Sequence, residues 1–231
     1  MSLLGNAAMV LFFDLDVEDA TEHDHWHTHE HFAERLGIPG FRRASRWAAA
    51  GPGPRYFVMY ETAEVETLTS DAYRARLDHP SPWTRTLMPH YRNMVRGLTR
   101  VVASSGAGIG GAALVVRFAA QPGREAALDA WLSGLVPQLA LHPGLAGAHL
   151  LRSAAAAEMT AEQAMRGRDG GVDGVLVVTG YDLATVREVS GNALGEAALA
   201  AHGAAPGRLA HTFRLAATAT GGEAVALPAS R

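Results

Sequence analysis

Residues 24–40, DHWHTHEHFAERLGIPG, and residues 129–144, DAWLSGLVPQLALHPG, share a pattern in which Asp-x-Trp is followed at a similar distance by Pro-Gly. A second match, without gaps, joins residues 60–68, YETAEVETL, to residues 181–189, YDLATVREV. Both matches occur in the same order, and a strand-like run precedes each. Because self-similarity of this kind is the sequence signature of repeated units, we predict an internal duplication.

Each half of the chain is predicted to have the element order βαββαβ. Turn signals such as Gly37-Ile38-Pro39-Gly40 separate the apolar runs. The predicted strands are 7–16, 41–48, 55–62, 98–103, 113–120, 146–152, 173–181 and 208–219, and the predicted helices are 18–36, 65–77, 83–96, 124–141 and 183–201. This order matches the ferredoxin-like motif. We therefore predict an α+β protein of two ferredoxin-like units, residues 1–104 and 112–231, joined by a linker at 105–111 and packed through their antiparallel sheets.

Two segments depart from the repeat. The second half contains an additional Ala-rich stretch at 154–171, which we interpret as a surface excursion. The first half contains the segment 80–93, PSPWTRTLMPHYRN, which is rich in aromatic residues, arginine and proline. This segment is either a lid or pocket wall, or a plainly packed helix.

Composition excludes several classes of protein. The chain has 231 residues, is 48% hydrophobic and has a net charge of -3. It has no cysteine, which removes disulfides and thiol chemistry, and no lysine, which removes Schiff bases and Walker-type phosphate loops. No basic run indicates a nucleic-acid partner, and no apolar stretch is long enough to span a membrane. We expect a cytoplasmic protein without nucleic-acid or membrane partners.

Five of the eleven histidines lie within residues 23–31. In the second half, an apolar stripe at helical spacing is predicted to face the sheet: Leu128, Trp131, Leu132, Leu135 and Leu139. Transferring this register to the first half places a polar set on the equivalent face, with His31 at its edge: His23, Trp26, His27, Glu30 and Glu34. Because buried ionisable groups are costly, this register predicts a polar cavity instead of a filled core. A competing register buries Ala33, Phe32 and Leu36 and turns His25 and His29 inward.

A metal site is an alternative for the same cluster. Three pairs have the i, i+4 spacing that lets two imidazoles share one ion: His23 with His27, His25 with His29, and His27 with His31. Glu30 is a candidate third ligand. We expect no physiological metal and no resident cofactor here, with a His-ligated metal or haem kept as an alternative.

The residues WHTHEH at 26–31, IPGF at 38–41, YE at 60–61, DAY at 71–73 and PWT at 82–84 resemble the EthD-like branch of the dimeric α+β barrel superfamily. The resemblance covers about residues 10–103. It implies a dimeric α+β barrel within one chain, and it places the Glu30-His31 pair and Trp83 at the pocket. His27 departs from the family pattern, in which an aromatic residue is commoner. The second half has Leu135-Val136 at the Glu30-His31 positions, so we expect it to be mainly structural.

These observations lead to a functional hypothesis. We predict a cofactor-independent acid–base enzyme, of a cyclase, isomerase or monooxygenase type, acting on a small hydrophobic or aromatic molecule. His31 is the predicted proton-transfer group, Glu30 orients it or stabilises its charged form, and His27 is a second candidate base. The cavity is predicted to be lined by Trp26, Tyr60 and Trp83. The alternative is a non-catalytic ligand-binding or assembly protein, and the fused pair is a candidate homodimer.

Overall fold

The strands of the protein close into one antiparallel barrel. The computed structural model describes residues 3–18, 20–154, 162, 165 and 169–224. Around the barrel the strand order is β1-β3-β2-β8-β5-β7-β6-β4. The strands are β1 (Ala7–Leu15), β2 (Phe41–Ala49), β3 (Tyr56–Thr62), β4 (Tyr91–Gly106), β5 (Ala112–Phe118), β6 (Leu145–Ser153), β7 (Gly174–Gly180) and β8 (Leu209–Thr220). A closed barrel leaves no sheet edge unpaired.

The barrel consists of two four-stranded units of the same topology. The first is β4-β1-β3-β2 and the second is β8-β5-β7-β6, which is the ferredoxin-like order in both cases. Antiparallel pairs join the units at two seams, β2 with β8 and β4 with β6. The predicted fold class is confirmed. The predicted linker at 105–111 begins inside β4, which continues to Gly106.

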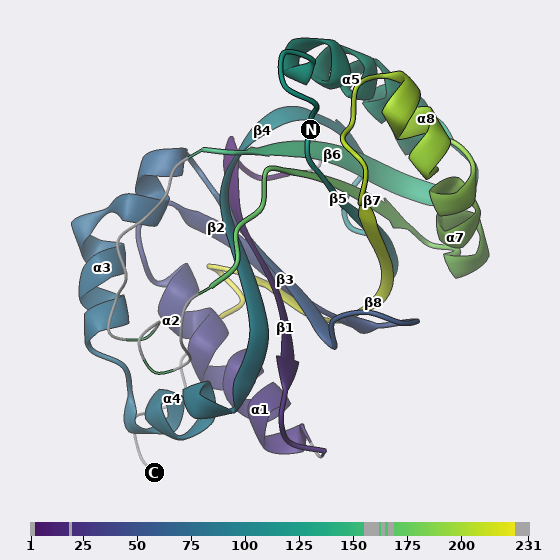
Figure 1. Cartoon of the computed structure of the whole chain (residues 1–231). Helices are drawn as coiled ribbons and strands as arrows, with labels where there is room; N and C mark the ends of the chain where they lie inside the picture. Colours follow the sequence, from purple (N-terminus) through teal and green to yellow (C-terminus); the bar gives the residue numbers. More distant parts are fainter. Residues whose placement is uncertain (1–2, 19, 155–161, 163–164, 166–168, 225–231) are drawn as a thin grey trace.

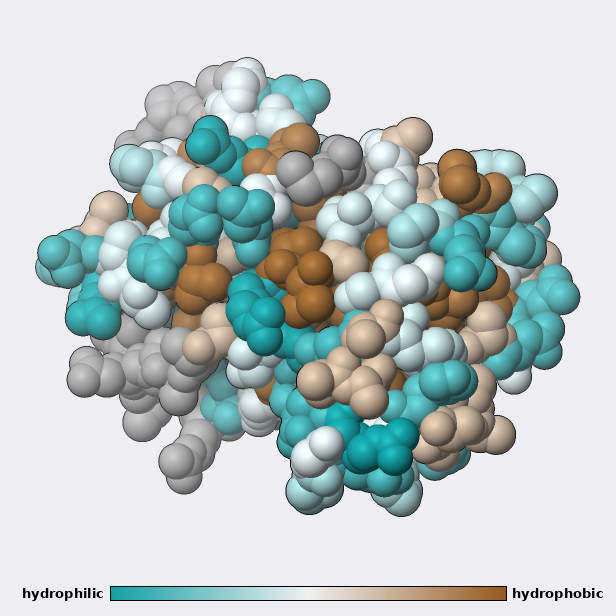
Figure 2. Space-filling model, turned by 90° about the horizontal axis from the view of Figure 1, so that it is seen from above, coloured by the Kyte–Doolittle hydropathy of each residue, from teal (hydrophilic) through white to brown (hydrophobic). Residues whose placement is uncertain are grey.

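Helices cover the outside of the barrel in two groups (Figure 1). The first half contributes α1 (Thr21–Trp26), a π-helical turn (His27–His31), α2 (Phe32–Leu36), a 3-10 turn (Val65–Thr69), α3 (Asp71–Asp78), α4 (Pro82–Leu87) and a second 3-10 turn (Met88–His90). The second half contributes α5 (Glu125–Leu141), α7 (Leu183–Gly191) and α8 (Glu196–Ala201). On the face shown in Figure 2, apolar residues are interspersed with polar ones. In the described part of the chain, no helix has the length and apolar character needed to cross a membrane.

This arrangement creates three apolar cores. One fills the barrel, where aromatic rings such as Phe12 and Phe57 stack at 5.1 Å between centroids. The other two lie between each helical layer and its side of the sheet. The core of the second half consists almost entirely of aliphatic side chains, whereas that of the first half contains tyrosines, methionines and the cavity described below.

The predicted helix at 83–96 is wrong in its second part. Pro89 lies just after α4, and β4 begins at Tyr91, which pairs with Leu15 of β1. Proline removes a backbone donor and disfavours helix at the preceding residue, so the chain leaves the helix there. The predicted helix at 65–77 is also divided, because Ser70 caps α3 by accepting a hydrogen bond from the backbone N–H of Tyr73.

The second sequence match is shifted by three residues from the structural one. Gly40 accepts a hydrogen bond from the N–H of Ala63, whereas Gly144 accepts one from the N–H of Tyr181. Ala63, not Tyr60, is therefore the structural counterpart of Tyr181. Strand pairing agrees with this shift, since Tyr60 lies opposite Met9 in the first half and Val178 lies opposite Leu114 in the second. The match of Tyr60 to Tyr181 pairs residues that occupy different places.

Candidate active site

The histidine-rich segment forms a helix with one widened turn. Between α1 and α2, residues His27–His31 form a π-helical turn, in which the N–H of Phe32 donates to the carbonyl oxygen of His27, five residues earlier. Such turns are rare and occur often at functional sites. Two side chains bond to the backbone just before this turn: the carbonyl oxygen of Asp24 accepts from the hydroxyl of Thr28 at 2.7 Å and from the buried Arg46 of β2 at 3.1 Å.

The π-turn decides which face of the helix is buried. His23, His27 and His31 are only 2%, 2% and 5% exposed, whereas His25 and His29 are exposed. The prediction that His23, Trp26 and His27 face inward therefore describes the helix as far as the turn. Beyond it, Phe32, Arg35 and Leu36 are buried, while Glu30 and Glu34, which the same register placed inside, are partly exposed. The competing register named Phe32 and Leu36 correctly but placed His25 and His29 on the wrong face.

Aliphatic residues occupy the same column in the second half. The helix α5 buries Leu128, Leu132, Val136 and Leu139 against its sheet, and Trp131 and Leu135 are only partly buried. Taking Trp26 and Trp131 as equivalent, Leu128, Leu132 and Val136 stand where the first half has His23, His27 and His31. The two halves thus place imidazoles and aliphatic chains at matching positions.

A cavity lies beside this histidine column. Its apolar wall consists of Met9, Leu11, Phe13, Val58, Leu77, Met88 and Met94. Its polar wall consists of His27, His31, Arg35, Tyr60, Tyr73, Tyr91, Arg96 and Glu162. About 420 Å³ lies outside protein atoms when the open side is included, but the part wide enough for water holds only about two molecules. A larger ligand must therefore displace part of the wall.

His27 is a neutral imidazole in this setting. Its Nε2 lies 3.4 Å from the hydroxyl of Tyr60, and its Nδ1 has no hydrogen-bond partner among the described residues. Burial lowers the pKa of His27 well below its usual range, and the positive charge of Arg46 acts in the same direction. Burial also raises the pKa of Tyr60, so this hydroxyl stays protonated.

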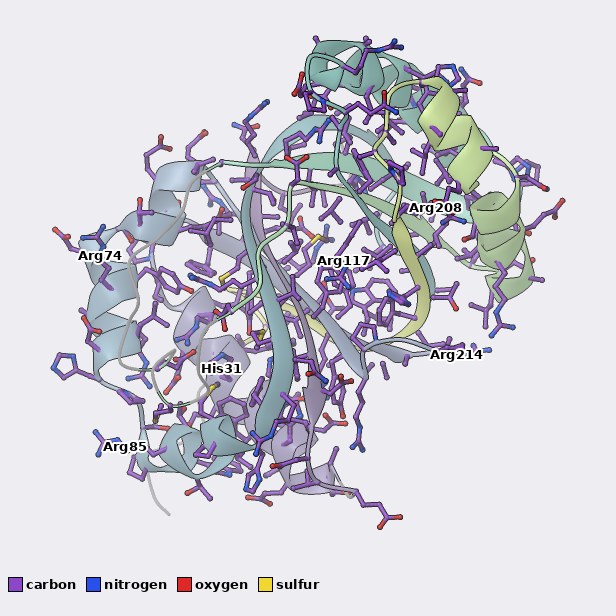
Figure 3. All side chains as sticks on the ribbon, in the orientation of Figure 1. His31, Arg74, Arg85, Arg117, Arg208 and Arg214 are labelled. Carbon is purple, nitrogen blue, oxygen red and sulfur yellow. The ribbon has the colours of Figure 1, made fainter. Side chains whose placement is uncertain are left out.

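His31 lies between the helical layer and the sheet, as Figure 3 shows. Its ring packs on that of Trp26, with centroids 4.5 Å apart, and its Nδ1 is 3.8 Å from a carboxylate oxygen of Glu34. We predicted that Glu30 orients His31. The carboxylate of Glu30 instead accepts from the indole N–H of Trp26 at 3.0 Å and from the hydroxyl of Ser81. Glu30 therefore fastens the helix to α4, and Glu34 is the carboxylate beside His31.

A chain of hydrogen bonds connects the cavity wall with the surface. Nε2 of His23 lies 2.8 Å from the hydroxyl of Tyr91, and Nδ1 lies 3.0 Å from a carboxylate oxygen of Asp24. Tyr91 lines the cavity, whereas the side chain of Asp24 is 39% exposed. Burial lowers the pKa of His23, although its bond to Asp24 opposes this effect. A neutral His23 can hand a proton along this chain.

A buried ion pair closes the other side of the cavity. Arg35, at the end of the histidine-rich helix, is 1% exposed, and its guanidinium donates to the carboxylate of Glu162 at 2.5 Å. Glu162 belongs to the additional stretch of the second half, which we had interpreted as a surface excursion. Its other described residues also contact the first half: Met165 packs on the apolar core, and Gly170 bonds to β4.

The three aromatic residues predicted to bind the ligand, Trp26, Tyr60 and Trp83, lie at different places relative to the cavity. Tyr60 lies in the cavity wall, and Trp26 is completely buried directly behind His31. Trp83 lies outside, where its indole donates to Glu22 at 2.8 Å and its ring lies 5.4 Å from that of His25.

Sequence reasoning missed five polar residues of the cavity wall: Arg35, Tyr73, Tyr91, Arg96 and Glu162. The composition of segment 80–93 was a signal for Tyr91, because this segment supplies Met88 and Tyr91 to the wall. No comparable local signal marked Glu162, which is 127 residues from its partner.

The described residues of the site do not suit a metal ion or haem. Within these residues, no group of three or more His, Cys, Asp or Glu side chains could hold a metal ion. Haem does not fit the cavity, because a flat macrocycle is far larger than the space for about two water molecules.

Comparison with known proteins supports the fold. No protein-family model matches the sequence, and no curated protein matches it. Among solved structures, an anthrone oxidase-like protein shares 14% identity over 100% of this chain and 99% of its own, with a TM-score of 0.63. A monooxygenase-like protein from Fusobacterium nucleatum subsp. nucleatum shares 7% identity over 94% and 96%, with a TM-score of 0.59. A haem-binding protein from Thermus thermophilus shares 9% identity over 92% of each chain, with a TM-score of 0.51. At these identities the likeness shows the fold alone, which is that of the dimeric α+β barrel proteins.

Proposed function

We propose that the chain is a cofactor-independent acid–base enzyme that acts on a small hydrophobic or aromatic molecule in the cavity of its first half. The observation that carries this proposal is the exchange of three buried aliphatic residues in one half for three buried histidines in the other. A core that serves only stability has no need of imidazoles, since a buried polar group costs free energy unless it is paired. Functional sites are where such local costs are expected.

In this proposal His31 removes a proton from the bound molecule. The imidazole of His31 can accept a proton, and the carboxylate of Glu34, which also pairs with Arg76, lies 3.8 Å from its Nδ1. The neutral His27 and the hydroxyl of Tyr60 offer hydrogen bonds to an oxygen that gains electron density. The chain from Tyr91 through His23 to Asp24 connects the cavity with solvent, and in this proposal a water molecule in the cavity carries the proton from His31 to Tyr91. Cyclisation, isomerisation and cofactor-free oxygenation all begin with such a proton removal.

The structural neighbours are consistent with the oxygenating form of this reaction. One is an anthrone oxidase-like protein and another is monooxygenase-like, and both share the fold with this chain. We also infer that the chain is a fused duplicate related to the EthD-like branch. The repeated strand order and the matching roles of Gly40 and Gly144 support this inference.

The test is a screen for turnover. The protein would be incubated in air, without added cofactor, with a panel of naphthols, hydroxyquinones and related phenols, and the products would be measured by mass spectrometry. We expect His31→Val, which copies the second half, to reduce turnover at least about 100-fold while leaving ligand affinity within a few-fold. His29→Val is the matched control, because His29 is exposed on the same turn.

Two results would count against the enzyme. Ligands that bind tightly but are returned unchanged would favour the alternative of a non-catalytic binding protein. Equal turnover by the wild type and His31→Val would remove His31 from the chemistry.

A further inference from the structure

The charges on the described part of the cavity wall do not balance. Among the residues that the structure describes, the wall contains two guanidinium groups, Arg35 and Arg96, and one carboxylate, Glu162. Arg96 donates to the sulfur of Met9 at 3.4 Å and to the hydroxyl of Tyr73 at 3.3 Å, and in the described part of the chain no carboxylate pairs with it. With the neutral His27 included, the wall has an excess of positive charge. A mostly apolar cavity with such an excess favours an anion over a neutral molecule.

Of the two arginines, Arg35 is the more deeply buried and most requires an anionic partner. Its guanidinium is 1% exposed, and a buried charge is costly unless an opposite charge accompanies it. The flat guanidinium group also matches the geometry of a carboxylate. Neighbouring residues hold Arg35 at the cavity, since its guanidinium lies 5.7 Å from the ring centre of Tyr73. Tyr73 in turn accepts from Arg96, so the two arginines approach the same part of the wall.

The carboxylate that pairs with Arg35 belongs to a residue distant in the sequence. Glu162 lies 127 residues from Arg35 and is contributed by the stretch between β6 and β7, outside the first unit. The free space beside it accommodates about two water molecules, so a ring-sized ligand must displace part of the wall. Three of the apolar wall residues are methionines, which adapt readily to a new neighbour. Among the described wall residues Glu162 is the one carboxylate, and a carboxylate on a ligand can reproduce its contribution to Arg35.

We infer that the ligand is an apolar acid whose ionised carboxylate replaces that of Glu162 on the guanidinium of Arg35, within reach of Arg96. This inference rests on the proposed function for the position of the pocket, and it adds the chemical class of the ligand. Glu162 is then an internal counterion that keeps Arg35 satisfied while the pocket is empty. The ligand's apolar body packs against the methionine and aliphatic wall, near His31 and Tyr60.

The test compares two probes of one shape, 1-naphthoate and 1-naphthamide, in calorimetric titrations of the full-length protein at pH 7. The carboxylic acid is ionised at this pH and the amide is neutral. We expect the wild type to bind naphthoate more tightly than naphthamide. Glu162→Gln, which removes the internal anion but keeps the side-chain shape, should tighten naphthoate binding about tenfold or more, because a charge-assisted bond no longer has a competitor. Naphthamide binding should change little.

A double variant protects the test against misfolding. Arg35→Gln alone leaves a buried carboxylate without its partner, whereas Arg35→Gln with Glu162→Gln removes both charges. We expect the double variant to bind naphthamide as the wild type does and to lose the preference for naphthoate. Arg85→Gln is the charge-matched control, since Arg85 points outward from α4 (Figure 3) and should leave both affinities unchanged.

The outcomes separate this inference from the proposed function. Equal binding of both probes, unaffected by Glu162→Gln, overturns the inference and leaves the hydrophobic pocket in place. Failure of both probes to bind to any of the variants overturns the pocket itself.

Discussion

The two helices that cover the sheet, one in each half, occupy matching places but bury different chemistry. The matching positions are His23, His27 and His31 in the first half and Leu128, Leu132 and Val136 in the second. The strand beneath shows the same contrast, with Tyr60 in the first half and Val178 in the second. One half therefore has a filled aliphatic core, and the other has a cavity with polar walls.

This difference shows how the chain divides stability and function. Burying a leucine or valine side chain contributes about 1.5–3 kcal/mol, whereas burying an unpaired imidazole costs free energy. The first half can carry that cost because both halves share one closed barrel, and the second half stabilises the whole. A single ferredoxin-like unit would leave the inner face of its sheet exposed.

Reciprocal exchange of residues between the halves should have the largest effect. We expect Leu132→His to lower the free energy of unfolding by about 3–5 kcal/mol, because it removes apolar burial and adds a buried polar group without a partner. His27→Leu should leave stability unchanged or raise it by about 1 kcal/mol, since it replaces a buried polar group with an apolar one. Urea unfolding of both variants measures these changes. A loss of similar size in both would mean that the halves are equally well packed.

The second-largest effect is expected in how the free energy of unfolding depends on pH. Burial lowers the pKa of His27 well below 6.5, so just below pH 6.5 the unfolded chain binds a proton that the folded chain does not. The contribution of the neutral His27 to the free energy of unfolding is therefore fully present above pH 6.5 and decreases as the pH falls below this value. We expect His27→Leu to reduce this slope between pH 6.5 and 5 by up to about 1.4 kcal/mol per pH unit, measured by urea unfolding.

Leu132→Ile is the control for this measurement, because position 132 in the second half has no titratable group. It should retain the wild-type slope. An unchanged slope in His27→Leu would show that the folded protein binds a proton at His27 as readily as the unfolded chain does.

The smallest difference in unfolding free energy is expected between variants of the two equivalent turn glycines, Gly40 and Gly144. Gly40 and Gly144 have φ values of 95° and 91°, and a Cβ at either would meet the hydroxyl of a threonine, Thr67 or Thr185, at 2.5 Å. We expect Gly40→Ala and Gly144→Ala each to lower the free energy of unfolding by about 1–3 kcal/mol, with the two values within about 0.5 kcal/mol of each other.

Gly111→Ala is the control for the glycine pair, because a Cβ at Gly111 meets nothing within 4 Å. Calorimetry of the three variants would show whether the two turns bear equal strain. A clearly larger loss at one of them would argue against a common structural role.

Local signals account for the parts of the fold that were predicted well. Apolar runs bounded by turn residues located every predicted strand except β4 within a few residues, because burial and turn geometry act over short stretches of chain. The element order then limited the topology to the ferredoxin-like arrangement. The division at Ser70 and the early start of β4 at Tyr91 were missed, since capping and the tertiary pairing with β1 overrode helical periodicity.

The candidate site was predicted only in part. The histidine cluster and its contrast with the leucines of the second half can be read from the sequence. The π-turn cannot, because helical periodicity assumes a constant 3.6 residues per turn, and one widened turn moves Arg35 inward and Glu34 outward.

The sequence by itself determined the paired βαββαβ units, the position of the polar half and the exclusion of thiol and lysine chemistry, because all three follow from residue types and short-range patterns. Only the tertiary structure decided which histidines face the cavity and where each repeat is in register. It also decided that Glu162 meets Arg35. These outcomes depend on packing between segments far apart in the chain, where the free energy of a buried charge or a filled space is settled by neighbours that no local pattern specifies.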